Sequence, residues 1–208
     1  MANKTKIAII LDRSSSMISL RDEMIDAFNE QVDKIKEEAK NEPTRVSFVT
    51  FASEVDEPVF WNRGTYKLKK ITKEDYDPAG LTAMYDAVGT TCSKLSELDD
   101  GETAFLVIVM SDGAENNSKK YTAKSLASTI DELQKSGRWT FTYLGANQDL
   151  SQVSESLNIN LDNTVGWVTS EAGVANLSKT VCNGLGNYFS ARSMNLTACD
   201  NLYENKSS

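Results

Sequence analysis

Three short polar segments of this chain carry oxygen ligands suited to a hard metal ion. The segments are Asp12-Arg13-Ser14-Ser15-Ser16, Gly80-Leu81-Thr82 and Ser111-Asp112-Gly113. Together they offer two carboxylates and three hydroxyls, a set that a divalent cation such as Mg²⁺ accepts. Because few of these ligands carry a negative charge, we expect an acidic group of a partner to complete the coordination of the metal. The expected metal ligands are Asp12, Ser14, Ser16, Thr82 and Asp112.

The residue types that the chain lacks exclude several other kinds of site. It contains no histidine, which excludes a Ser-His-Asp triad, acid–base catalysis by imidazole and every His-ligated metal site. The three cysteines, Cys92, Cys182 and Cys199, are widely spaced and form no Cys-x-x-Cys pair, which argues against zinc. Scattered cysteines in odd number fit a reducing compartment, and we therefore expect a cytoplasmic protein.

Length and composition indicate one globular domain. The chain has 208 residues, of which 40% are hydrophobic and 25% charged, as is ordinary for a soluble fold. Its net charge of −8 argues against nucleic acid, because phosphate binding needs a basic surface. No apolar run approaches the roughly 18 residues that span a bilayer, and the first residues do not resemble a signal peptide. We expect no membrane association.

Apolar runs and helical periods alternate along the chain. Strands are predicted at 7–11, 45–51, 103–110, 139–144 and 164–168. Apolar residues at helical spacing predict helices at 20–39, 82–98, 126–133, 150–157 and 170–188. Continuous apolar strands that alternate with helices predict a doubly wound, mostly parallel sheet with helices on both faces, which is an α/β fold.

The segment 54–72 departs from this alternation. Pro58 restricts it to the edge of a sheet, so we predict one antiparallel edge strand or hairpin, with a turn at 62–64 and extended structure at 66–68. Trp61 and Tyr66 are interpreted as packing residues. Residues 1–192 are expected to form the domain, and 193–208 are expected to be a polar, frayed C-terminal tail.

The predicted fold brings the polar segments together. In a doubly wound sheet the ligand site lies beyond the carboxyl ends of the strands. Asp12 follows the first strand and Asp112 follows a later one. If those two strands are neighbours, both aspartates reach the same crevice, and the loop before the helix at Thr82 can join them there.

The motifs resemble those of the von Willebrand factor type A domain. That family has a metal-ion-dependent adhesion site with the pattern Asp-x-Ser-x-Ser, then a distant Thr, then a later Asp, and the resemblance extends over roughly residues 6–191. Asp-Arg-Ser-Ser-Ser-Met and Ser-Asp-Gly-Ala-Glu-Asn-Asn are most similar to the stand-alone bacterial and bacteriophage branch. Ser15 departs from the family, in which many members have glycine. Where that position requires a positive φ, serine would be strained.

The resemblance implies a function. In the ligand-bound state of the family the three hydroxyls bind the metal directly, and the two aspartates act largely through water. It implies a non-enzymatic, Mg²⁺-dependent adaptor or complex subunit that binds an Asp or Glu of a protein partner, with Mn²⁺ or Ca²⁺ as other metals. It also implies that Thr82 can couple the site to a movement of the C-terminal helix, here 170–192. We take further partner contacts to come from residues near the metal loops: Arg13, Asn116, Asn147 and Gln148.

Two alternatives remain open at this point. One is a metal-dependent phosphotransferase or hydrolase of the haloacid-dehalogenase type. In that class the acid–base aspartate stands two residues after the first, where this chain has Ser14, which cannot perform that role. The other is a metal-free structural scaffold. Metal-binding calorimetry separates this alternative from the leading interpretation.

Overall fold

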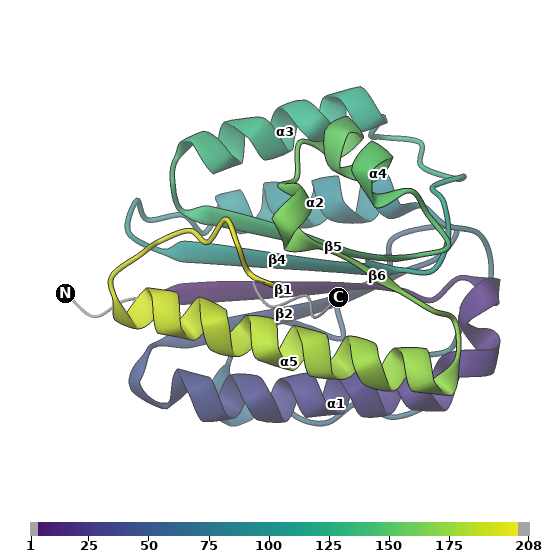
Figure 1. Cartoon of the computed structure of the whole chain (residues 1–208), viewed down its shortest axis with the longest axis horizontal. Coiled ribbons are helices and arrows are strands. Elements are labelled where there is room, and N and C mark those ends of the chain that lie inside the picture. Colours follow the sequence, from purple (N-terminus) through teal and green to yellow (C-terminus); the bar gives the residue numbers. More distant parts are fainter. Residues whose placement is uncertain (1–3, 204–208) are drawn as a thin grey trace.

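The computed structural model describes residues 4–203 and shows one twisted sheet between two layers of helices (Figure 1). The six strands lie in the order β3-β2-β1-β4-β5-β6, and all pairs are parallel except β2 with β3. The doubly wound, mostly parallel sheet with one antiparallel edge strand is therefore confirmed. The strands are β1 (Thr5–Asp12), β2 (Thr44–Phe51), β3 (Phe60–Gly64), β4 (Ala104–Ser111), β5 (Trp139–Ala146) and β6 (Thr164–Trp167).

Helices cover both faces of the sheet, which explains why its central strands are apolar throughout. Helices α1 and α5 pack side by side on one face, and α2, α3 and α4 lie on the other (Figure 1). Every residue of β4 is buried as a result. The helices are α1 (Arg21–Glu38), α2 (Met84–Ser96), α3 (Ala123–Lys135), α4 (Leu150–Leu157) and α5 (Glu171–Ser193). None of the helices described is both long enough and apolar enough to cross a membrane.

The edge segment differs in detail from its prediction. The expected turn at 62–64 is instead part of β3. Asn62 does adopt a left-handed conformation (φ 46°), but it does so where the β2–β3 register shifts, as in a bulge, and the strand continues past it. Its N–H donates to Ser47 Oγ (2.9 Å), and its carbonyl accepts from Arg45 Nε (2.7 Å). The predicted extended run at 66–68 is likewise wrong, because Thr65–Lys67 forms a 3₁₀ turn.

The C-terminal segment is not frayed as far as the structure describes it. Leu202 and Tyr203 are buried in the core beneath α5. The Tyr203 ring lies over Gly184, where an added Cβ would stand 2.5 Å from the ring, and the Thr142 hydroxyl donates to the Tyr203 hydroxyl (2.9 Å). Residues 194–203, which we call the C-terminal strap, therefore pack on α5 and β5. The predicted tail beyond Tyr203 lies outside the described residues.

The topology fixes where the polar loops meet. Strands β1 and β4 are adjacent and parallel, with Leu11 opposite Met110. Asp12, the last residue of β1, and Asp112, the first residue after β4, therefore lie at the same edge of the sheet, at the right-hand end of the molecule in Figure 1.

Candidate metal centre

The predicted metal ligands at the ends of β1 and β4 form one hydrogen-bonded network. Ser14 Oγ lies 3.0 Å from Ser16 Oγ, and Ser16 Oγ donates to Asp112 Oδ1 (2.7 Å). The Asp12 carboxylate accepts from the Ser14 N–H (2.7 Å) and from the Ser111 hydroxyl. The structure thus joins four of the five predicted ligands in one chain of contacts, from Asp12 through Ser14 and Ser16 to Asp112.

The two carboxylates are buried without a cationic partner. Asp12 is fully buried and Asp112 nearly so. Burial raises the pKa of Asp12 above its ordinary value, hydrogen bonds from Ser111 and Ser14 oppose this, and the charge of Asp112 raises it further. No ion pair involves either carboxylate among the residues described. Buried charge in this state is costly unless a cation compensates it.

Thr82 lies beside this network and is positioned by its backbone. Its N–H donates to Asn116 Oδ1 (2.9 Å), and its carbonyl accepts from the N–H groups of Asn116 (3.0 Å) and Asn117 (3.2 Å). The side chain is buried. Thr82 Oγ1 stands 3.9 Å from the place that a Cβ on Gly113 would occupy. The fifth predicted ligand is therefore next to the turn that carries Asp112.

Ser15 joins the first and second loops. Its N–H donates to the Gly80 carbonyl (3.0 Å), and its hydroxyl accepts from the Gly80 N–H (2.9 Å). Gly80 has φ +86°, and a Cβ there would lie 2.6 Å from Ser53 Oγ, so glycine is required. Ser15 itself has no positive φ. Serine at this position is therefore unstrained and adds a hydrogen bond that glycine could not make.

The loop after Asp112 is held by two acidic side chains that the sequence analysis did not identify. Asp86 accepts the N–H groups of Lys119 (2.8 Å), Lys120 (2.9 Å) and Tyr121 (2.8 Å). Burial would raise the pKa of Asp86, but these backbone donors outweigh it and the pKa lies below its ordinary value. Glu115 similarly accepts backbone N–H groups, including that of Tyr85 (2.9 Å). Asp86 stands in the first turn of α2, where acidic residues are common as simple helix caps. The sequence alone therefore does not show that Asp86 holds a distant loop.

The four candidates for partner contacts have different surroundings. Arg13 forms a bidentate pair with Asp56 (2.5 Å for each bond). Asn116 holds Thr82, as described above, and Gln148 donates to the Gly113 carbonyl (2.8 Å). Asn147 is exposed in a left-handed turn (φ 56°). Three of these side chains therefore organise the loops, and their contact with a partner stays a prediction.

The donor set fits a hard divalent cation. Only oxygen atoms converge here, and hydroxyl and carboxylate oxygens are the ligands that Mg²⁺ takes in proteins. The part of the chain that the structure describes contains no cluster of three or more His, Cys, Asp or Glu residues that could hold a metal. A site here consequently depends on hydroxyls and on the two uncompensated carboxylates Asp12 and Asp112.

Comparison with known proteins identifies the family. A family model of the von Willebrand factor type A domain matches residues 6–180. The chain belongs to this family. A search of curated proteins gave no match to this VWA domain.

Solved structures share the fold of this VWA domain. Proximal thread matrix protein 1 from the mussel byssus, with a zinc-occupied MIDAS motif, matches at a TM-score of 0.62 and 20% identity, over 87% of this chain and 45% of that one. The pilus adhesin SpaC from Lactobacillus rhamnosus GG matches at a TM-score of 0.69 and 11% identity, over 90% of this chain and 31% of that one. The vWF domain of the pili tip protein Mfa5 from Porphyromonas gingivalis matches at a TM-score of 0.60 and 12% identity, over 89% of this chain and 97% of that one. This chain thus spans less than half of the mussel and Lactobacillus proteins, and identities this low establish the fold alone.

Proposed function

We propose that this VWA domain is a Mg²⁺-dependent protein-interaction module whose metal site takes a carboxylate of a partner. The observation that carries the proposal is the pair of buried carboxylates, Asp12 and Asp112, that lack a cationic partner and share a network with serine hydroxyls. A bound divalent cation would supply the missing positive charge and offer a coordination position to an Asp or Glu of the partner. Members of this family are interaction modules, which supports the same proposal.

Some residues of the chain would bind the metal, and others position the loops that carry them. Asp12, Ser14, Ser16, Thr82 and Asp112 would hold the metal, and three of these five contribute neutral hydroxyls. Because hydroxyls bring no negative charge to the metal, a carboxylate of a partner can replace water in its coordination without crowding it with anionic protein ligands. Mn²⁺ or Ca²⁺ could occupy the same oxygen set. The Ser15–Gly80 bonds and Asn116 fix the loops that present these groups.

Calorimetric titration with Mg²⁺ and Mn²⁺ tests the metal site. Wild-type protein should bind one equivalent, and Asp12→Ala should lose binding while keeping the fold. Asp26→Ala is the matched control, because Asp26 is an exposed carboxylate on α1. Unchanged affinity in Asp12→Ala would sink the assignment and leave the metal-free scaffold as the better interpretation.

Water-proton relaxation of the Mn²⁺-loaded protein tests the carboxylate. N-acetyl-glutamate amide should displace metal-bound water and lower the relaxivity, and the glutamine analogue should not. Thr82→Ala should weaken the response to the carboxylate more than the affinity for Mn²⁺, because we expect Thr82 to join the coordination mainly in the partner-bound state. Equal effects of the two analogues would show that no carboxylate binds at the metal.

We propose further that the protein is not an enzyme and works in the cytoplasm. Ser14 stands where a haloacid-dehalogenase-type enzyme needs its second aspartate, so the phosphotransferase alternative lacks its acid–base group. The thiols of Cys92 and Cys182 are free, which is compatible with a reducing compartment. The motif sequences favour the bacterial and bacteriophage branch of the family. Phosphatase turnover that disappears in Asp112→Ala would overturn the non-enzymatic proposal.

A further inference from the structure

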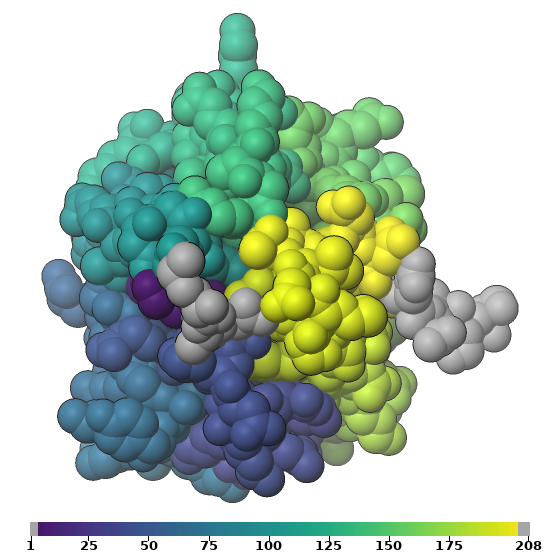
Figure 2. All heavy atoms as spheres, turned by 90° about the vertical axis from the view of Figure 1, so that its left-hand side faces the viewer, coloured from purple at the N-terminus to yellow at the C-terminus, as the bar shows by residue number. Residues whose placement is uncertain are grey.

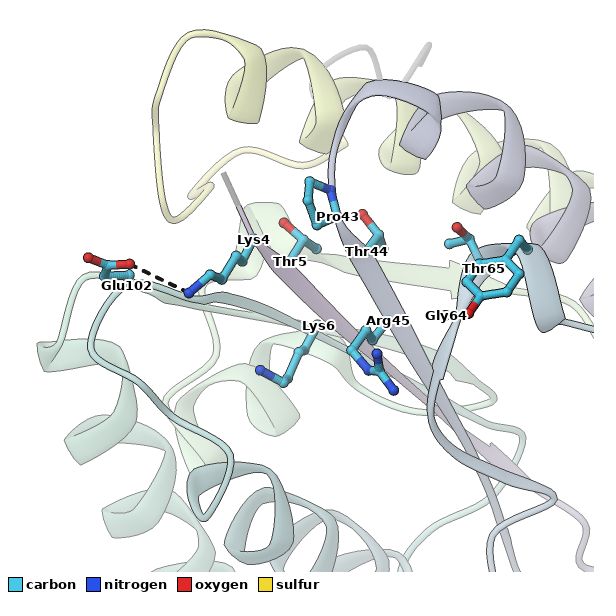
Figure 3. A pocket seen from close by; sticks show the side chains of 10 residues that line it. Lys4, Thr5, Lys6, Pro43, Thr44, Arg45, Gly64, Thr65 and Glu102 are labelled. Atoms are coloured by element: carbon cyan, nitrogen blue, oxygen red, sulfur yellow. Dashed lines mark ion pairs between the residues drawn. The ribbon is translucent and has the colours of Figure 1, made fainter. Parts of the chain in front are cut away.

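A second candidate site lies at the end of the sheet opposite the metal centre. A hollow of about 540 Å³ opens where β1 and β2 begin, and Lys6, Arg45 and Tyr66 are among its lining residues (Figure 3). Figure 2 views this end of the molecule, with the purple start of β1 beside the blue residues of β2 and β3. Lys6 and Asp12 are six positions apart on β1, which amounts to about 20 Å of extended strand. The hollow is therefore separate from the metal centre.

Two cations are held side by side in this hollow. Lys6 and Arg45 are register partners on the neighbouring parallel strands β1 and β2, so their side chains share one face of the sheet. In Figure 3 both side chains leave the same side of the sheet, and their charged ends point apart, Lys6 to the left and Arg45 to the right. Lys6 Nζ donates to the Leu98 carbonyl (3.2 Å), and Arg45 Nε donates to the Asn62 carbonyl. Among the residues described, neither cation forms an ion pair. Like charges in such neighbouring positions repel each other.

The surroundings of Lys6 lower its pKa. Burial is the main cause; the charge of Asp100, and to a smaller extent that of Asp99, acts in the opposite direction, and the positive charge of Arg45 adds to the lowering. Within residues 4–203, the one acidic residue that lines the hollow is Glu102, which already pairs with Lys4 (3.6 Å). An anion placed between Lys6 and Arg45 would relieve their repulsion.

The surroundings of the hollow are basic in an otherwise acidic protein. An adjoining hollow of about 580 Å³ shares Arg45 and Tyr66 with the first, and none of its lining residues in the described part of the chain is acidic. It adds three cations, Arg63, Lys67 and Lys69. The whole chain carries a net charge of −8. This concentration of positive charge attracts anions to one end of the molecule.

Tyr66 provides an aromatic wall beside the cations. The sequence analysis interprets Tyr66 and Trp61 as packing residues, and Trp61 does pack against the core. Tyr66 does not, because 83% of it is exposed. An exposed ring next to paired cations can support the flat, apolar part of a ligand whose charged part reaches Lys6 and Arg45.

We propose that this hollow binds a small organic anion, with a phosphate or carboxylate head group between Lys6 and Arg45 and a flat apolar body against Tyr66. Its volume lies within the range of about 300–1,000 Å³ that is typical of small-molecule sites. A head group placed between the charged ends of Lys6 and Arg45 would be flanked by two cations from neighbouring strands, and charge-assisted hydrogen bonds to both would orient it.

NMR and calorimetric titrations in buffer stripped of divalent metal test this site apart from the metal centre. The probes are AMP, inorganic phosphate, indole-3-acetate and uncharged adenosine. We expect AMP or indole-3-acetate to bind with shifts confined to the starts of β1 and β2 and to the ring of Tyr66. The stronger of these two ligands identifies the head group as phosphate or carboxylate. Inorganic phosphate should bind more weakly because it lacks the flat body, and adenosine should not bind.

Variants assign the binding to named side chains. Arg45→Gln should weaken binding by about 10-fold or more, because it removes a charge-assisted hydrogen bond. Lys124→Gln removes an equal charge from an exposed site on α3 and should leave the affinity within about 2-fold. Tyr66→Ala changes an exposed side chain, so it should fold normally and weaken AMP or indole-3-acetate but not inorganic phosphate. The proposal is overturned if no probe binds at millimolar concentration, or if Arg45→Gln and Lys124→Gln behave alike.

Discussion

Replacing Asp12 by asparagine should make the metal-free protein more stable and the Mg²⁺-loaded protein less stable than wild type. The asparagine would keep the shape of the side chain but remove one of two buried like charges. Its amide oxygen can still accept from the Ser14 N–H, whose bond to Asp12 measures 2.7 Å. Ser111 can turn its proton to the Gly113 carbonyl, already 3.0 Å away, and accept from the new amide. The substitution therefore leaves the local hydrogen bonds intact.

The expected energies predict that Asp12→Asn is the more stable protein without metal and that wild type is the more stable one in Mg²⁺. Two charge-assisted hydrogen bonds become neutral ones, which costs about 1 kcal/mol each. The lost desolvation cost of a buried ion is several kcal/mol, so without metal the variant should gain about 1–2 kcal/mol. At a Mg²⁺ concentration of about 100 times the dissociation constant, wild type gains about 2.7 kcal/mol and the variant, which cannot bind the metal, gains nothing. Wild type should then be the more stable protein by about 1 kcal/mol.

Urea denaturation followed by circular dichroism, in EDTA and in Mg²⁺, measures both differences. Asp26→Asn is the control, since it removes a charge from the exposed surface of α1 and should shift neither curve by more than about 0.5 kcal/mol. A variant that is less stable than wild type in EDTA would refute the argument that the two carboxylates are uncompensated. A variant that Mg²⁺ stabilises as much as wild type would refute the role of Asp12 as a ligand.

Substitutions at three further positions test the supports of the site and the strap. Asp86→Ala leaves the three N–H groups at 119–121 without their acceptor and should cost about 2–4 kcal/mol at neutral pH. Because the pKa of Asp86 is lowered by folding, this difference in urea stability should shrink as the pH falls below the pKa of an unfolded aspartate and on through the lower pKa of Asp86. Tyr203→Ala removes a buried ring and should cost about 3–4 kcal/mol, and Tyr203→Phe, which loses only the hydroxyl bond to β5, about 1 kcal/mol in the same assay. Ser15→Ala should cost about 1 kcal/mol and accelerate hydrogen exchange of the Gly80 amide, whose acceptor it removes; unchanged exchange would contradict the loop pairing.

The sequence predicts those parts of the molecule that repeat a simple pattern. The apolar run before Asp12 and the run before Asp112 indicated buried parallel strands, and the structure places them side by side as β1 and β4. Because parallel strands end at the same edge, the convergence of the two aspartates followed from the fold. The three-part motif then selected Thr82 from many threonines, and Thr82 lies beside Gly113.

Features that depend on contacts between distant residues could not be predicted. Nothing in the sequence around Asn62 distinguishes a bulge from a turn, because asparagine favours a left-handed conformation in both. The burial of Tyr203 depends on the space above Gly184, 19 positions earlier, which no periodicity reveals. The pairing of Arg13 with Asp56 likewise joins residues whose proximity only the folded chain establishes.

The C-terminal strap has a consequence for how this protein can be cut and fused. The family model ends at residue 180, inside α5, which continues to Ser193. A fragment that stopped at 180 would lose the last turns of this helix together with Leu202 and Tyr203. The apolar face of the sheet beneath them would then be open to solvent and to other copies of the fragment. An affinity tag joined directly after Ser193 would likewise displace the strap, so the smallest fragment worth expressing reaches Tyr203.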